Sequence, residues 1–286
     1  VSMGQADISQ RRRKWRNAAA GIVCWVGANV LALWLLDVCE AWRLSAEHRV
    51  SSAVIRAFDR RIVSVDVPDH DKPVSLAYRV RKPSLWTATG SMPLLVILHG
   101  SGERGYDGAQ QLGGIPAVMC TEAWADGFPC AILAPQCPSR FHWSSPLARE
   151  LNMTDILLQM IDDVLTDRRI DPQRVYLSGY SMGGYGAWSL AAAAPDRFAA
   201  VVPIAGGAAP DLAEALTEVP IWAVHSADDE MVPVEGTRQI VKAIQAAGGE
   251  PRYTELTDAG HHSWPEVFQA ESAVLEWMFE QRTGNW

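Results

Sequence analysis

A serine at position 181 lies in the pattern Gly-x-Ser-x-Gly, which runs from Gly179 to Gly183. An apolar stretch, 175–177, precedes this pattern, and a helical pattern that stops at Pro195 follows it. Five-residue patterns recur by chance, but a strand before and a helix after are typical of a nucleophile elbow, the turn that exposes one hydroxyl. We expect side chains at the two glycines to clash in so tight a turn. The N-terminus of the helix would favour negative charge developing near Ser181.

Two later loops carry groups that could act together with this serine. An acidic loop, Asp228-Asp229-Glu230, follows the expected strand at 220–225, and His261-His262 follow the expected strand at 252–256. A histidine can take a proton from a serine hydroxyl, and a carboxylate can orient that histidine and stabilise its imidazolium form. A single acid or histidine is usually an ordinary surface residue. The order serine, acid, histidine, with each after a strand, favours a catalytic triad.

A third loop, 99–105, is rich in glycine and follows the expected strand at 94–99. Acyl transfer needs two N–H donors for the oxyanion, and removing one costs about 3 kcal/mol. We expect these donors to be the backbone amides of Ser101 and Met182. The chain has no P-loop lysine, and no C-x-x-C or Cys/His spacing. A P-loop for nucleotide phosphates and a metal site are therefore not expected.

The pattern along the chain predicts an α/β fold with a mostly parallel sheet and helices on both faces. Two alternating strands come first and are expected to be antiparallel, and buried apolar runs then alternate with helical patterns. The last helix is expected to carry residues from Val267 to Met278. The eight expected strands lie near 62–67, 74–80, 94–99, 130–135, 174–178, 199–204, 220–225 and 252–256. Function in such sheets gathers at the carboxyl ends of the strands.

From about residue 90 to 280, the chain resembles the α/β-hydrolase superfamily, within its carboxylesterase and predicted-peptidase branch. That branch lies near feruloyl-esterase-like and prolyl-oligopeptidase-like serine hydrolases. The segments that carry the resemblance are Leu98–Gly105, Ala134–Pro138, Asp171–Gly186, Ala227–Pro233 and Gly260–Trp264.

The resemblance implies a role for each of the candidate residues. Ser181 would be the nucleophile and His261 the base, with His262 as the alternative base. Asp229 would be the acid, because the family's aspartate stands three residues before the valine of the Val-Pro pair; Asp228 and Glu230 are the alternatives. Ser101 and Met182 would form the oxyanion hole. The family implies no metal and no cofactor.

The N-terminal part of the chain suggests a membrane segment. The basic residues Arg11, Arg12, Arg13, Lys14 and Arg16 precede the stretch 18–36, which contains no charged residue. As a helix this stretch would be about 28 Å long, close to the ~30 Å of a bilayer core. Positive charge before the span predicts a signal anchor with the catalytic domain outside the cytoplasm. A cleaved signal peptide, giving a secreted protein, and a buried helix of a soluble protein are the alternatives.

The expected organisation is a basic segment (1–17), a transmembrane signal anchor (18–36), a juxtamembrane connector (37–60) and an α/β-hydrolase catalytic domain (61–286). Of the 286 residues, 48% are hydrophobic, which is enough for a full core, and the net charge of −8 argues against nucleic acid as a partner. Cys120, Cys130 and Cys137 are expected to be buried free thiols, or to include one disulfide if the domain is exported.

The sequence predicts a serine hydrolase that cleaves small carboxylic esters through an acyl-enzyme. The alternatives are a serine peptidase of the same fold and a catalytically inactive, membrane-tethered binding protein. The stretch between the strands that end at Ile204 and begin near Pro220 is too short for a cap domain. We therefore expect an open cleft, walled by Phe141, His142, Trp143 and Trp264, although aromatic packing beneath the loops would explain these residues equally well.

Overall fold

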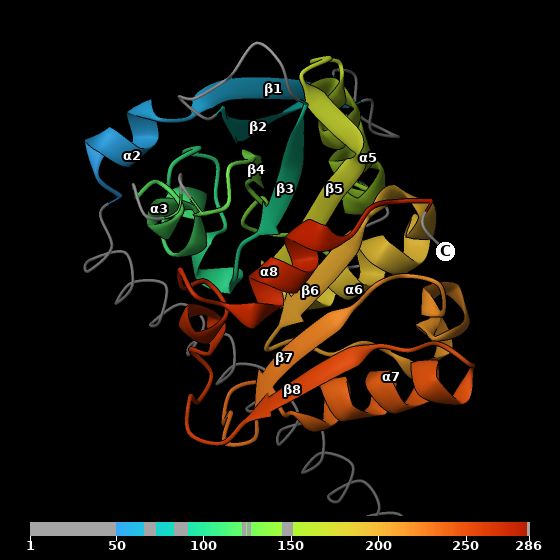
Figure 1. The fold of residues 1–286 in the computed structure, drawn as a ribbon. Helices are drawn as coiled ribbons and strands as arrows, with labels where there is room; N and C mark the ends of the chain where they lie inside the picture. Colours follow the sequence, from blue (N-terminus) through green and yellow to red (C-terminus); the bar gives the residue numbers. More distant parts are fainter. Residues whose placement is uncertain are drawn as a thin grey trace, which may run out of the picture. The chain divides into compact units, whose positions relative to one another are not determined.

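An eight-stranded sheet organises the part of the chain that the structure describes (Figure 1). This computed structural model describes residues 50–65, 73–82, 91–121, 124, 127–144 and 151–284. The strands are β1 (Asp59–Val65), β2 (Val74–Arg81), β3 (Met92–Leu98), β4 (Ala131–Pro135), β5 (Ile170–Tyr180), β6 (Ala200–Ile204), β7 (Trp222–Ser226) and β8 (Arg252–Leu256). Their order in the sheet is β1-β2-β4-β3-β5-β6-β7-β8.

The sheet confirms the expected fold class. Strand β2 pairs antiparallel with β1 and β4, and the neighbouring pairs from β4 to β8 are all parallel. All eight strands overlap the ranges that the apolar patterns predicted. Strand β5 begins four residues earlier than expected, because Ile170 still pairs with Met92 across an irregularity in the register. The carboxyl ends of the parallel strands meet at one edge, as the functional argument requires.

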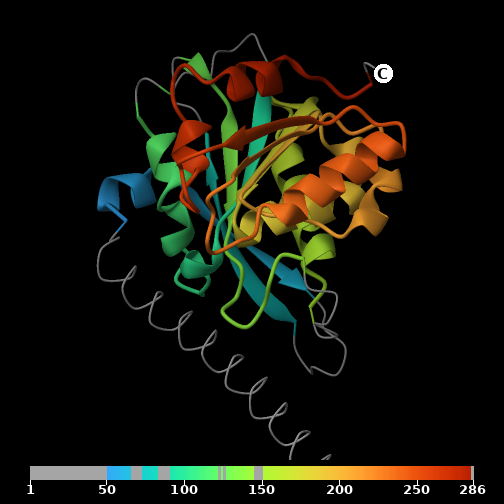
Figure 2. The same cartoon turned by 90° about the horizontal axis from the view of Figure 1, so that it is seen from below.

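Helices cover both faces of this sheet (Figures 1 and 2). Helices α5 (Met153–Leu165), α6 (Met182–Ala193) and α7 (Glu235–Ala246) pack on one face, and α3 (Ile115–Val118) and α8 (Ala273–Glu280) pack on the other. Strand β3 has apolar side chains for both faces. Its residues Leu94, Val96 and Leu98 belong to the core under α5, α6 and α7, and Leu95 and Ile97 to the core under α3 and α8. Alternation along a strand sends successive side chains to opposite faces, and each such leucine stabilises the fold by about 1.5–3 kcal/mol.

The last helix differs from the expectation. Val267 is buried but lies before α8, just after a 3-10 turn at Trp264–Glu266. Helix α8 begins only at Ala273, because the hydroxyl of Ser272 accepts the backbone N–H of Leu275 and caps the helix there. Apolar residues before a cap can share a core with the helix without being part of it.

The connection between β6 and β7 is fully described and contains two short 3-10 turns, Pro210–Leu212 and Glu214–Leu216. It holds no cap domain, as expected from its length. The expected connector, 37–60, is described only from residue 50 and contains helix α2 (Ser52–Arg56) before β1 begins at Asp59. The predicted basic segment (1–17) and signal anchor (18–36) lie outside the described residues. Among the residues that are described, no helix is long and apolar enough to cross a bilayer.

Candidate active site

The turn from β5 into α6 places Ser181 at the edge of the sheet. Its backbone is in the left-handed region, with φ 55°, which is uncommon for a residue with a side chain. A Cβ atom at Gly179 would lie 2.1 Å from the carbonyl oxygen of Gly183, and one at Gly183 would lie 1.9 Å from that of Leu98. Both glycines are therefore sterically required, and the serine hydroxyl stands clear of the helix that follows, as expected.

Three predicted side chains come together at this turn. The Nε2 atom of His261 lies 3.0 Å from the Oγ atom of Ser181, and its Nδ1 atom lies 2.8 Å from Oδ2 of Asp229. The carboxylate only accepts, so Nδ1 carries the ring proton and Nε2 is free to accept the serine proton. The side chain of Asp229 is fully buried. This arrangement can transfer a proton from the hydroxyl to the imidazole.

The alternatives to Asp229 and His261 have other contacts. Asp228 accepts hydrogen bonds from the hydroxyl of Ser226 and, at 3.0 Å, from the backbone N–H of Gly260. Glu230 is exposed. His262 packs edge-on against the rings of Tyr180 and Trp264. The structure thus brings together Ser181, Asp229 and His261 out of the candidates that the sequence left open.

The two expected oxyanion donors come from adjacent segments. Met182 opens helix α6, whose first turn has no side-chain cap, so its first amides have no partner within the helix. Gly183 packs directly against the backbone at the end of β3, with its Cβ position within 3 Å of the carbonyl oxygens of Leu98 and His99. The short 3-10 turn that starts at Ser101 continues from there. The loop after β3 is therefore held against the start of α6.

His99, at the end of β3, fixes the first peptide of this loop. Its Nε2 accepts the backbone N–H of Cys137 at 2.9 Å, so its Nδ1 carries the proton and donates it to the carbonyl of Gly100 at 2.6 Å. Burial lowers the pKa of His99 to about 4, which keeps the ring neutral. In a trans peptide the carbonyl of Gly100 and the N–H of Ser101 point in opposite directions. His99 therefore sets the direction of the Ser101 amide.

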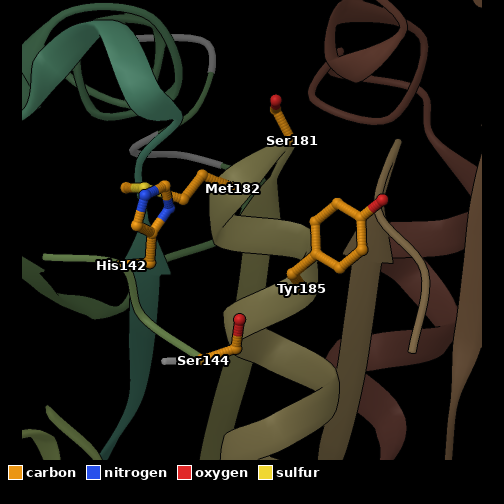
Figure 3. A pocket seen from close by; sticks show the side chains of 5 residues that line it. All are labelled: His142, Ser144, Ser181, Met182 and Tyr185. Atoms are coloured by element: carbon orange, nitrogen blue, oxygen red, sulfur yellow. The ribbon is translucent and has the colours of Figure 1, made fainter. Parts of the chain in front are cut away.

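A pocket of about 370 Å³ opens beside the serine (Figure 3). Ser181, Met182 and Tyr185 line it from the elbow and α6, and His142 and Ser144 line it from the loop after β4. Burial raises the pKa of Tyr185; a hydrogen bond to the backbone of Gly207 opposes this shift, and the nearby charge of Asp229 adds to it. The phenol is therefore neutral. The pocket offers apolar surface together with a few polar groups, as small-molecule sites do.

The two tryptophans expected at the cleft are placed differently from each other. Trp143 is only 2% exposed, and its indole N–H donates to the carbonyl of His99 at 2.9 Å. The structure therefore puts Trp143 in the core beneath the pocket and not on its wall, because its ring packs with His99 under the loop. Trp264 is half-buried beside His262 and the backbone of Gly114; its contact with a substrate stays a prediction.

The described residues hold no group of three or more His, Cys, Asp or Glu side chains arranged for a metal ion. Cys120, Cys130 and Cys137 are free thiols. Burial raises the pKa of both Cys130 and Cys137 to about 12, so these two are inert side chains of the core.

Sequence reasoning missed several residues of the site. Tyr185 stands one helical turn after Ser181, so its spacing could have placed it at the pocket. Ser144 follows β4, and its position at a strand end was the available indication, whereas His142 was expected at the cleft and does line the pocket. His225 gave none, because it lies inside β7 and its contact with Asp229, at 3.1 Å, depends on the fold of the following loop.

Comparison with known proteins identifies related hydrolases. Residues 147–278 match the model of the Phospholipase/Carboxylesterase family. A solved structure, "Crystal Structure of a Thermostable Esterase", is 33% identical with a TM-score of 0.71, and the match covers 80% of this chain and 64% of that one. NocK of Nocardia uniformis subsp. tsuyamanensis, which is assigned as an esterase, is 29% identical over 223 residues, covering 70% of this chain and 60% of NocK.

A third relative is Poly(3-hydroxyalkanoate) depolymerase C of Paucimonas lemoignei, 32% identical over 117 residues, which are 40% of this chain and 28% of that protein. The chain therefore spans less than two thirds of the length of each of these relatives.

Proposed function

Because the chain belongs to the α/β-hydrolase superfamily, in its branch of carboxylesterases and related peptidases, we propose that it is a serine esterase acting through an acyl-enzyme. The observation that carries the proposal is the hydrogen-bonded series Ser181–His261–Asp229, with contacts of 3.0 and 2.8 Å at the edge of a pocket. These distances are within the range that proton transfer between a nucleophile and its base requires.

In the proposed reaction the Oγ atom of Ser181 attacks the ester carbonyl while Nε2 of His261 takes the hydroxyl proton. The carbonyl oxygen becomes an oxyanion and receives the amides of Ser101 and Met182, and Asp229 stabilises the imidazolium. The C–O bond to the alcohol breaks as His261 returns the proton to the leaving oxygen. Water then attacks the acyl-enzyme by the same route, releasing the acid and restoring Ser181.

The pocket favours small, water-accessible esters. Its lining residue Tyr185 contacts the backbone of Gly207 in the connection from β6 to β7, which contains two 3-10 turns and no cap. Its lining combines the apolar Met182 with the polar side chains of His142 and Ser144. Because no cap is inserted between β6 and β7, no cap there has to open at a lipid interface before substrate can enter. We therefore expect hydrolysis of dissolved short-chain esters.

Substituting Ser181→Ala tests the proposal. We expect hydrolysis of p-nitrophenyl acetate to fall by at least about 10⁴-fold, because no other group can form the acyl-enzyme. Labelling of the protein by a fluorophosphonate probe should disappear as well. The control is Ser64→Ala, a serine of β1 whose hydroxyl hydrogen-bonds that of Ser75 on the neighbouring strand β2. A Ser181→Ala protein with the wild-type rate would contradict the proposal.

The same assay separates the two alternatives. A peptidase of this fold would label with the fluorophosphonate but would cleave short peptides faster than esters of matched side chain. An inactive binding protein would fail to label, although Ser181 lies only 3.0 Å from the imidazole. A panel of acyl chain lengths, run beside a peptide panel, therefore decides among the three.

For location, we propose that residues 18–36 anchor the chain in a membrane with the catalytic unit outside the cytoplasm. The absence of charge in this stretch and the basic residues before it support the proposal. Alkaline extraction of membranes from cells that express the full chain provides the test, with a chain lacking residues 1–40 as the control. Recovery of the intact chain in the soluble fraction would contradict the anchor, whereas recovery of a shortened chain would favour a cleaved signal peptide.

A further inference from the structure

A second histidine contacts the buried acid of the site. The ring of His225, at the end of β7, has no exposed surface, and its Nε2 lies 3.1 Å from Oδ2 of Asp229. That oxygen is the one that His261 contacts through Nδ1 at 2.8 Å. His225 also lies 3.0 Å from the carbonyl oxygen of Val232 in the same loop. The role proposed above for His261 does not involve His225.

The carboxylate of Asp229 is saturated with donors. Its Oδ1 accepts the backbone N–H groups of Met231 at 2.9 Å and Val232 at 2.8 Å, and its Oδ2 faces the two imidazoles. A buried carboxylate with a donor at each of its four acceptor positions cannot rotate without breaking hydrogen bonds. His225 supplies the only side-chain contact to Asp229, apart from His261, among the hydrogen bonds of the described residues.

The surroundings of His225 determine which of its nitrogens carries the proton. Both neighbours of Nε2, the carboxylate of Asp229 and the carbonyl of Val232, are acceptors, so Nε2 must be an N–H. Burial lowers the pKa of His225, which keeps the ring neutral and leaves Nδ1 as an acceptor. Thr237, on α7, lies 2.7 Å from this Nδ1 and donates its hydroxyl proton there.

Thr237 has a second possible acceptor, the carbonyl of Gly206 at 3.1 Å. The contact with His225 is shorter, and the carbonyl of Gly206 already receives the indole N–H of Trp188 at 2.9 Å. A single hydrogen-bonded line therefore runs from α7 through β7 to the site, from Thr237 through His225 to Asp229. It joins the triad at the acid, on the side away from Ser181.

We propose that His225 is a positioning residue, whose neutral ring donates from Nε2 to Asp229 and holds that carboxylate in the orientation that receives the Nδ1 proton of His261. Its kinetic consequence rests on the proposed esterase function. The terminal torsion of an aspartate is broad, so one lost contact lets the plane of the carboxylate turn. A neutral ring also leaves the charge of Asp229 to the imidazolium that forms on His261, which a second cation beside the acid would oppose.

Two substitutions of matched shape test the proposal. His225→Gln keeps an N–H donor at about the reach of Nε2, and His225→Met fills nearly the same volume without a donor. We expect His225→Met to lower kcat about tenfold at an unchanged KM, since a buried hydrogen bond to a charged group is lost, and His225→Gln to stay within about threefold of wild type. Equal losses in both variants, or a wild-type kcat in His225→Met, would overturn the proposal.

A double substitution separates positioning from general damage to the fold. If His225 acts through Asp229, His225→Met should have no further effect on kcat once Asp229→Asn is present. A loss that persists at full size in the Asp229→Asn protein would mean that His225 serves the fold and not the acid. If His225→Met does not fold, His225→Asn replaces it, because its shorter amide cannot reach Asp229; a wild-type kcat there would equally overturn the proposal.

A spectroscopic readout makes the test independent of ester hydrolysis. The proton on Nδ1 of His261 is followed by NMR in protein labelled with ¹⁵N in the imidazole rings. We expect its resonance to persist in His225→Gln and to broaden by exchange in His225→Met. If wild type hydrolyses no ester and takes no fluorophosphonate, the proposed function fails, yet the resonance still decides the inference: an unchanged signal in His225→Met would contradict it.

Discussion

The two halves of the site around Ser181 use different parts of the chain, side chains in one and backbone amides in the other. The proton-transfer half consists of side chains: His261 and Asp229 meet at 2.8 Å, with His225 behind them. The oxyanion half consists of backbone, with the amide of Met182 at the start of α6 and that of Ser101 in the loop after β3. Side chains here supply chemistry in one half and only hold the chain in place in the other.

This difference determines how each half can fail. Replacing the side chain of Ser181 or His261, whose hydrogen bonds lie within the triad, should leave the backbone where it was, so the loss should fall on kcat. The oxyanion half has no side chain to remove at its amides, and it depends on tight contacts such as that of Gly183 with the carbonyl of Leu98. Damage to that half must therefore move the backbone, and it should appear in stability as well as in rate.

Gly183→Ala should have the largest effect of this kind. The new Cβ would lie 1.9 Å from the carbonyl oxygen of Leu98, a backbone atom that cannot move alone. We expect a loss of more than about 4 kcal/mol in the free energy of unfolding, or no folded protein, since few single substitutions damage a core further. Urea unfolding followed by circular dichroism measures it.

The matched control is Gly127→Ala, since a Cβ at Gly127 would meet no atom of the described residues within 4 Å. It should stay within about 1 kcal/mol of wild type. A Gly183→Ala protein as stable as this control would mean that the loop after β3 can withdraw from α6. The oxyanion half would then not depend on tight backbone contacts, and its contrast with the proton-transfer half would be wrong.

The same contrast explains what the sequence could predict. The proton-transfer half was accessible because Ser181, Asp229 and His261 are distinctive residue types that follow strands in a known order, and the sheet that positions them followed from apolar periodicity. The donors of the oxyanion half, Ser101 and Met182, were predictable only from their positions, in the glycine-rich loop and directly after the nucleophile, because every residue except proline has a backbone N–H. Packing of Trp143 beneath the loops was predicted as one of two alternatives, but the structural roles of His99 and His225 could not be predicted, because they depend on burial and on which nitrogen faces which neighbour.

His99 gives a pH-dependent prediction about the oxyanion half. Its pKa is lowered from 6.5 to about 4, first by burial, so the unfolded chain binds a proton there more readily than the folded one. The stability that the neutral ring contributes is complete above pH 6.5 and is lost as pH falls towards 4. With 1.36 kcal/mol for each unit, this loss is about 3 kcal/mol.

The measurement compares urea unfolding of wild type and His99→Asn at pH 7 and pH 4. Asparagine keeps a donor near the position of Nδ1, towards the carbonyl of Gly100, but does not titrate. We expect the decline in stability with acid to be smaller in His99→Asn by about 3 kcal/mol, other carboxylates contributing equally to both. An equal decline in both proteins would show that protonation of His99 does not cause this loss of stability. It would also argue against His99 as the residue that orients the peptide between Gly100 and Ser101.

The smallest effect is expected at Asp228, which lies in the proton-transfer half but outside the acid–base series. Asp228 ties the loop of His261 to the end of β7, since it accepts the hydroxyl of Ser226 and the amide of Gly260 at 3.0 Å. Asparagine keeps an acceptor oxygen for these donors, whereas alanine does not. We therefore expect Asp228→Asn to lower kcat about twofold and Asp228→Ala about tenfold, as a loop that carries the base becomes less ordered.

These values set Asp228 apart from a triad acid. If Asp228 were the partner of His261, its asparagine variant would lose about 10⁴-fold in kcat, because an amide cannot hold the imidazole in the required tautomer. That loss is expected for Asp229→Asn, whose parent carboxylate lies 2.8 Å from Nδ1 of His261. The kcat values of Asp228→Asn and Asp229→Asn are compared with p-nitrophenyl acetate as the substrate. A much lower kcat for Asp229→Asn would show that, of these two adjacent acids, Asp229 acts on the base and Asp228 holds the loop of the base.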